Sequence, residues 1–125
     1  MQLGPTFSEM KDPTTIDPAT RARALAAKEA DPLDPVNLYN VTWRGPQNEI
    51  YYAVIPPELT EVDAPIVVIY SREFPTGSHK VGASYSVLAE MVVTGEVDPE
   101  EHVLVWPSTG NYGAVSYTHL RAHET

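Results

Sequence analysis

The chain has 125 residues, in which 8 Lys and Arg residues stand against 17 Asp and Glu residues, so its formal net charge is -9. This acidic balance argues against a protein that coats DNA or RNA, because neutralising phosphates needs a basic face. The sequence contains no cysteine, which excludes disulfides, thiolate metal sites and cysteine nucleophiles. The length suits one ordinary domain, and we expect neither a nucleic-acid partner nor a metal site.

The sequence shows no targeting or membrane segment. Its first ten residues lack the basic and apolar regions of a signal peptide. Its longest apolar run, residues 64–70, is far shorter than the roughly 18 residues that a membrane span needs. We therefore expect a cytoplasmic protein with no membrane partner.

The first half predicts an arm, a helix and two strands. Residues 1–16 are polar and rich in proline, which predicts an extended arm. Residues 17–30 begin with Asp-Pro, which is typical of a helix start, and continue as an Ala-rich run. After a connector over residues 31–40, residues 41–44 and 50–55 predict two strands around a Gly-Pro turn.

The second half contains a segment with a helical period. Apolar side chains spaced by 4, 3 and 4 positions share one helix face: Val81, Tyr85, Leu88 and Val92. We predict a helix that begins near Ser78 and ends at Thr94 and Gly95, because glycine readily adopts the left-handed conformation that terminates a helix.

Two short β-branched runs flank this predicted helix. Residues 66–70 and 103–106 predict strands that are buried on both faces. The order strand, helix, strand predicts an α/β fold built from βαβ units with parallel strands. Ligands bind outside the carboxyl ends of such strands, so we expect the loops 71–80 and 107–113 to meet at one site.

Lys80 is the first candidate for chemistry. It stands at the first turn of the predicted helix, among the small residues Gly77, Ser78, Gly82 and Ala83, which would let a planar ring approach. The positive end of the helix dipole disfavours a protonated amine there, and burial would act in the same direction. A neutral lysine amine can attack an aldehyde. The alternative interpretation is a solvated lysine on an exposed helix start.

Two segments together resemble a known enzyme family. Gly77-Ser78-His79-Lys80 is followed, one predicted βαβ unit later, by Ser108-Thr109-Gly110-Asn111. This combination is similar to the fold-type II pyridoxal phosphate enzymes, which include the tryptophan synthase beta subunit, cysteine synthase, threonine synthase and threonine dehydratase. The resemblance covers about residues 66–114.

The resemblance implies a role for each matched residue. Lys80 would be the catalytic residue and would hold pyridoxal 5'-phosphate as a Schiff base. Asn111 would bond the ring oxygen of this cofactor, and His79 would bind the cofactor by packing near its phosphate. The residues that would hold the substrate carboxylate are Ser108, Thr109 and Gly110.

The same resemblance implies a lyase or synthase of amino-acid metabolism. It would act on a small amino-acid substrate by β-elimination or β-replacement, and family members are commonly homodimers. His79 is typical of tryptophan synthase-like members, whereas the asparagine loop is closer to the cysteine synthase group, so the substrate stays open. A threonine synthase or dehydratase-like enzyme is one alternative. A non-catalytic α/β module that binds a nucleotide or a partner is another, although residues 107–113 lack the glycines of a dinucleotide motif and the Gly-Lys-Ser/Thr of a P-loop.

The chain divides into three parts. Residues 1–65 form the predicted arm, helix and hairpin, and residues 66–114 form part of a pyridoxal phosphate-binding domain. Residues 115–125 resemble the translation of a sequencing-library adapter, so His119 and His123 are given no functional role. We therefore expect the natural chain to continue past residue 114, where the family's phosphate-binding loop lies, and we expect the chain as written to be unstable and inactive.

The remaining polar and aromatic residues near these segments predict structural roles. Arg72 and Glu73 are interpreted as a surface or structural pair. The residues interpreted as core or interface aromatics with no cofactor role are Trp43, Tyr51, Tyr52 and Trp106.

Overall fold

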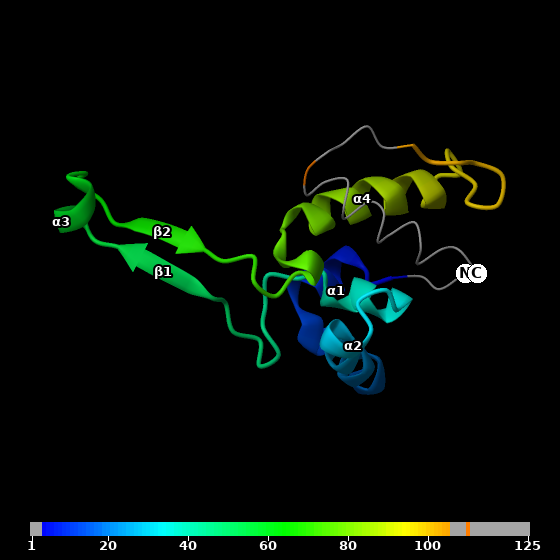
Figure 1. Cartoon of the computed structure of the whole chain (residues 1–125), viewed down its shortest axis with the longest axis horizontal. Coiled ribbons are helices and arrows are strands. Elements are labelled where there is room, and N and C mark those ends of the chain that lie inside the picture. The colour runs from blue at the N-terminus through cyan, green and yellow to red at the C-terminus, as the bar shows by residue number, and fades with distance from the viewer. Residues whose placement is uncertain (1–3, 106–109, 111–125) are drawn as a thin grey trace.

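The computed structural model describes residues 4–105 and residue 110. Figure 1 shows a helical body from which a hairpin of two strands extends. The elements, in chain order, are α1 (Phe7–Lys11), η1 (Pro13–Thr15), α2 (Pro18–Ala30), η2 (Pro35–Asn40), β1 (Tyr52–Ile55), α3 (Pro57–Thr60), β2 (Ile66–Ile69), η3 (Pro75–Gly77) and α4 (Lys80–Val93). The described chain therefore mixes helices with one small sheet.

Within the described residues 4–16, two short helices replace the extended arm that was predicted over residues 1–16, so that prediction is wrong for this part of the chain. α1 begins with a capping box, in which the Thr6 backbone N–H donates to Glu9 Oε2 at 2.7 Å and the Glu9 N–H donates to Thr6 Oγ1 at 3.2 Å. Asp12 caps η1 through a bond from the Thr14 N–H. These local side-chain bonds satisfy the first free N–H groups of each helix and outweigh the high proline content.

α2 has the predicted bounds. Asp17 Oδ2 accepts a hydrogen bond from the Thr20 N–H at 2.9 Å, and Pro18 occupies the first turn. The predicted connector after α2 contains η2, which packs against α2 through the buried side chains of Ala24, Ala27 and Val36. The Asn40 side-chain amide also donates to the Ala24 carbonyl at 2.7 Å. η2 therefore belongs to the core rather than to a solvated linker.

The hairpin differs from the predicted pairing. β1 and β2 are antiparallel, with Tyr52 opposite Ile69 and Ile55 opposite Ile66. The predicted strand over residues 41–44 is reduced to an isolated bridge between Arg44 and Ile50. The position of β2 is as predicted, but its burial on both faces is not, because all four of its residues are exposed.

The parallel pair expected between residues 66–70 and 103–106 is not formed within the part of the chain that the structure describes. β2 pairs with β1 alone, in a sheet of two strands, and residues 103–105 lie outside any strand, with Val103 and Val105 exposed. Trp106 lies outside the described residues. A short apolar run thus predicts a strand but does not determine its partner.

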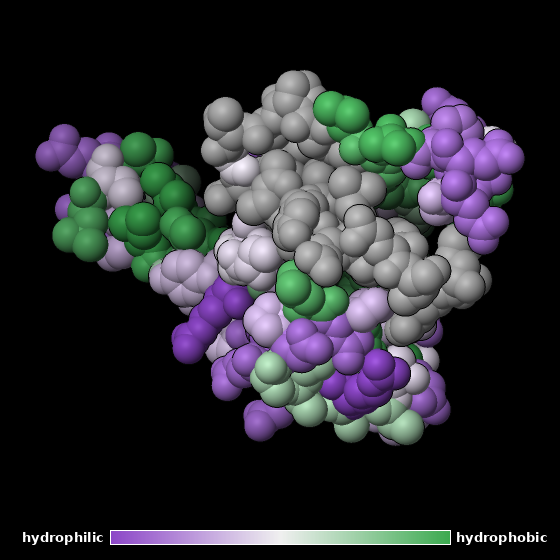
Figure 2. Space-filling model, turned by 45° about the vertical axis from the view of Figure 1, so that its right-hand side comes forward, coloured by the Kyte–Doolittle hydropathy of each residue, from purple (hydrophilic) through white to green (hydrophobic). Residues whose placement is uncertain are grey.

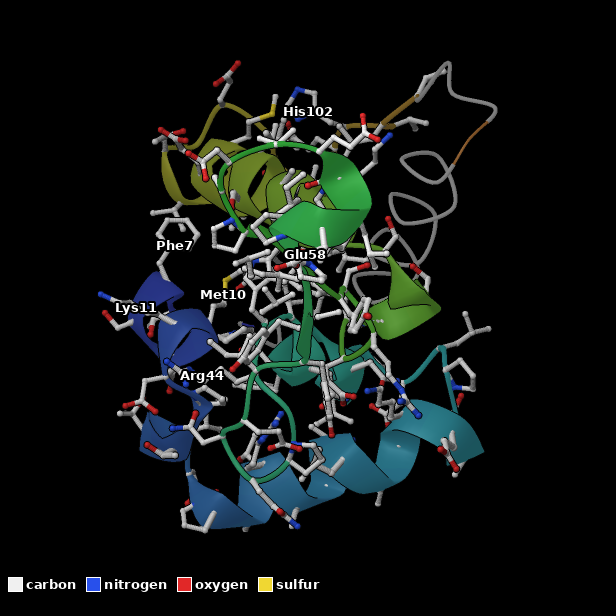
Figure 3. The ribbon with its side chains drawn as sticks, turned by 90° about the vertical axis from the view of Figure 1, so that its left-hand side faces the viewer. Phe7, Met10, Lys11, Arg44, Glu58 and His102 are labelled. Carbon is white, nitrogen blue, oxygen red and sulfur yellow. The ribbon has the colours of Figure 1, made fainter. Side chains whose placement is uncertain are left out.

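α4 matches its prediction closely, ending just before Gly95, which has φ +76°. Its predicted apolar face is buried at Val81, Tyr85 and Leu88 and half-buried at Val92. Met10 of α1 contacts both core clusters on this face, and Figure 3 shows its side chain between α1 and α4. Helices from the two ends of the described chain therefore share one core.

Within residues 4–105 and 110, no helix combines the length and the apolar character needed to cross a membrane.

Candidate functional site

A tight turn between β2 and α4 places the predicted lysine motif. The Gly77 N–H donates to the Phe74 carbonyl at 2.9 Å, and Ser71 Oγ donates to the Gly77 carbonyl at 2.9 Å. Thr76 and Gly77 both have left-handed backbones, with φ +64° and +68°. Glycine accepts this conformation freely, but a β-branched threonine is strained in it. The turn therefore holds a strained residue four positions before Lys80.

Ser78 organises the start of α4. Its Oγ accepts a long hydrogen bond from the Lys80 N–H at 3.4 Å, and its carbonyl accepts one from the Val81 N–H at 3.2 Å. Ser78 is buried, so it supports the helix start and does not line an open site. His79, which directly precedes the helix, makes no side-chain capping bond.

Lys80 was predicted in the first turn of a helix that begins near Ser78; it is the first residue of α4, and it is exposed. The burial that was expected to favour its neutral form is therefore not provided by the described residues. Among the described side chains, no carboxylate forms an ion pair with the Lys80 amine. The amine is thus accessible to a dissolved aldehyde.

The small residues around Lys80 serve two different purposes. A Cβ built on Gly77 would meet no atom of the described residues within 4 Å, so these residues leave the turn open at Gly77. A Cβ on Gly82 would lie 3.4 Å from Phe74 Cε1 and 3.8 Å from Val41 Cγ1. Gly82 therefore allows α4 to pack closely on the core, and the expectation that it gives a planar ring room to approach is wrong.

An aromatic stack borders the lysine motif. The rings of Trp43 and His79 are 5.9 Å apart with an interplanar angle of 25°. The Trp43 ring also meets the buried Phe74 ring edge to face, at 4.9 Å and 80°. Trp43 was predicted to be a core or interface aromatic, yet it is 42% exposed. Sequence reasoning missed the contact with His79, because no local spacing connects two residues so far apart in the chain.

The charged residues of the turn are held by other elements. Lys28 of α2 donates to Glu73 Oε2 at 2.8 Å, so Glu73 pairs with α2 and not with Arg72. The Arg72 guanidinium lies over the Tyr51 ring, 5.8 Å from its centroid. The predicted pair of Arg72 with Glu73 is therefore not formed, and each residue contacts a different part of the chain. The Lys28–Glu73 bridge ties α2 to the segment that presents Lys80.

The predicted second loop is described in one residue only. Gly110 is exposed, and a Cβ built on it would meet nothing within 4 Å. The other residues of this loop that were predicted to bind cofactor or substrate lie outside the described residues: Ser108, Thr109 and Asn111. In the part of the chain that is described, no group of three or more His, Asp or Glu side chains is placed to hold a metal ion.

Comparisons with known proteins yield no relative: no family model matches the chain, and no curated protein or solved structure matches it.

Proposed function

We propose that residues 1–114 are the N-terminal part of a pyridoxal phosphate-dependent lyase or synthase that acts on a small amino acid. The proposal depends on the motif resemblance, and one structural observation supports it best. The Lys80 amine is exposed at the first residue of α4, directly after a turn that is open in front of Gly77. A dissolved aldehyde can reach an exposed amine in this position.

The described donor set fits this cofactor. A primary amine is the group that reacts with the cofactor's aldehyde, and the neighbouring imidazole of His79 can donate a hydrogen bond to a phosphate. Both side chains are exposed. These two residues account for the contact with the aldehyde and for one contact with the phosphate. We propose that the phosphate loop and the residue that faces the pyridine nitrogen follow residue 114 in the natural chain.

The proposed reaction gives each residue a separate task. When bound, the cofactor supplies an electron sink for the substrate's Cα electrons. Lys80 Nζ would hold the cofactor and, once displaced by the substrate amine, would accept the Cα proton. The hydroxyls of Ser108 and Thr109 and the Gly110 N–H would bind the substrate carboxylate, which orients the Cα bond that breaks. The Asn111 amide would fix the cofactor ring.

The finer features of the predicted fold belong to this proposal. We infer that the complete protein has the parallel βαβ units of fold-type II enzymes, that residues 115–125 are not native, and that the natural protein is a cytoplasmic homodimer. Loss of a β-substituent followed by hydrolysis would give a keto acid and ammonia, whereas addition of a second nucleophile would give a new amino acid. A threonine synthase or dehydratase-like reaction is the alternative within the same cofactor chemistry.

The test uses the uninterrupted natural reading frame. The protein is incubated with pyridoxal phosphate, reduced with borohydride and mapped by peptide mass spectrometry. The first 125 residues contain three lysines, Lys11, Lys28 and Lys80, and we expect the label on Lys80 alone.

Two variants control this experiment. Lys80→Arg keeps the positive charge but removes the primary amine, and should abolish labelling. Lys11→Arg makes the same exchange at an exposed lysine of α1 and should leave labelling unchanged. A label on any lysine other than Lys80, or no stoichiometric label, contradicts the proposal and favours the non-catalytic module.

A further inference from the structure

The segment that carries Trp43 is fixed on both sides of the indole. Val41 and Thr42 are buried, and Thr42 Oγ1 donates to the Met10 carbonyl at 2.7 Å. The same hydroxyl accepts a bond from the Arg44 N–H at 3.1 Å. Phe74, against which the indole packs edge to face, belongs to the buried cluster with Val41. Trp43 is therefore a rigid surface although its outer part is exposed.

This surface lies against the residue next to the lysine. The His79 ring stacks on Trp43 and makes no capping bond. Within the part of the chain that is described, the stack restricts the rotation of the His79 ring. An exposed imidazole without such a contact would sample several rotamers and would lose that freedom when it binds an anion. A ring that is already held avoids this entropic cost.

We propose that Trp43 is a positioning residue that holds the His79 imidazole for contact with the phosphate group of the cofactor. This inference rests on the proposed function, because it concerns the same cofactor. It adds a residue that lies outside the lysine motif and was assigned no part in cofactor binding. Trp43 acts through His79 and touches neither the aldehyde nor the substrate.

The test separates the phosphate from the rest of the cofactor. The natural full-length protein and its Trp43→Leu variant are titrated with pyridoxal phosphate and with pyridoxal, which carries the same aldehyde and ring but no phosphate. Aromatic stacking of ordinary strength predicts that Trp43→Leu raises the Kd for pyridoxal phosphate about three- to tenfold. The Kd for pyridoxal should stay unchanged.

Three further variants make the result decisive. Trp43→Phe retains a stacking ring and should recover most of the affinity for pyridoxal phosphate. His79→Gln should weaken pyridoxal phosphate binding. Adding Trp43→Leu to this variant should raise the Kd little further, because the effects of two residues that act in one contact are not additive.

A fluorescence measurement tests the stack itself. In the 125-residue chain with Trp106→Phe, acrylamide should quench Trp43 emission more strongly after His79→Gln, because one indole face is uncovered.

The outcomes distinguish this inference from the proposed function. If Trp43→Leu raises the Kd for pyridoxal and the Kd for pyridoxal phosphate by the same factor, Trp43 has a general structural role and the inference is overturned. Labelling at Lys80 would still support the proposed enzyme in that case. If His79→Gln leaves the quenching of Trp43 unchanged, the stack is absent and the inference fails. If neither ligand binds and Lys80 is not labelled, both proposals fall.

Discussion

At the residue scale, Tyr85 links the N-terminal segment to α4. Its hydroxyl donates to the Pro5 carbonyl at 2.7 Å, and its ring packs with Leu38 and Met10. A Cβ on Gly4 would lie 2.5 Å from the Tyr85 hydroxyl, so glycine is needed where the chain crosses this ring. Burial raises the pKa of Tyr85 to about 12, with smaller contributions from Tyr39 and Glu9.

Tyr85 should make the protein sensitive to alkaline pH. The unfolded chain releases the phenol proton near the ordinary pKa of about 10, whereas the folded chain keeps it until about 12. The folded state therefore binds more protons between these values, and the free energy of unfolding falls as the pH rises through this window. Tyr85→Phe should make the free energy of unfolding fall less steeply over this pH range. Because the variant loses the bond to Pro5, its free energy of unfolding at pH 8 should be about 1 kcal/mol lower.

The measurement is urea unfolding at a series of pH values from neutral to strongly alkaline. Tyr52→Phe is the matched control, because Tyr52 is 61% exposed on β1, and this variant should follow the parent chain. If the free energy of unfolding of Tyr85→Phe falls as steeply at alkaline pH as that of the parent chain, a group other than Tyr85 causes the decrease.

At the element scale, the local sequence of α4 predicts the bounds of the helix, but the glycine at position 82 lowers its stability. Its apolar face and its C-terminal glycine stop define the bounds of the helix, but Gly82 is the third residue of the helix and lies in its first turn. Glycine in a helix lowers stability relative to alanine, because the backbone loses more freedom on folding. The 3.4 Å between a Cβ at this position and Phe74 leaves room for one methyl group and no more.

Gly82→Ala should therefore stabilise the chain, and a larger side chain should not. We expect Gly82→Ala to raise the free energy of unfolding by up to about 1 kcal/mol, and Gly82→Leu to lower it by about 1–3 kcal/mol, because the added atoms overlap Phe74 and Val41. Ala83→Gly, at an exposed neighbouring position, is the control and should be destabilising. Thermal unfolding followed by circular dichroism measures all three, and a destabilised Gly82→Ala would contradict the packing described above.

At the scale of the whole molecule, the hairpin is an exposed apolar element. Figure 1 shows it extending from the helical body, and Figure 2 shows hydrophobic side chains gathered over it. Every residue of β2 is at least 38% exposed, and Tyr52 and Val54 of β1 are exposed as well. Strands Tyr52–Ile55 and Ile66–Ile69 carry no charged residue to prevent edge-to-edge pairing. An isolated hairpin of this kind is marginally stable in water.

The 125-residue chain should associate with itself through this hairpin. We expect its mass in sedimentation or light scattering to rise with concentration, because pairing of two β2 edges buries apolar surface on both copies. Val67→Lys, at the centre of β2, should shift the chain towards the monomer. Val93→Lys is the control, since Val93 is 80% exposed at the end of α4 and lies outside the sheet. A chain that stays monomeric at high concentration, or an equal effect of both lysines, would contradict this prediction.

Much of the fold could be predicted from local signals, and the rest could not. The bounds of α2 and α4 were predictable because Asp17 and Gly95 act on their own helix ends, and the positions of the strands followed from β-branched runs. The missed helix α1 also had a local signal, the Thr6 and Glu9 capping box. For the candidate site, the place of Lys80 at the helix start was predictable, but its exposure was not.

By itself, the sequence determined where α2 and α4 begin and end to within two residues, which face of α4 is apolar, and that Lys80 lies in the first turn of that helix, because these features depend on residues within one or two turns of each other. Only the tertiary structure decided that β2 pairs antiparallel with β1, that Glu73 bonds Lys28, and that Trp43 stacks on His79. Such contacts join segments distant in the chain, and their geometry depends on how the intervening elements pack. Burial is decided in the same way, because an apolar strand is buried only where another part of the molecule covers it.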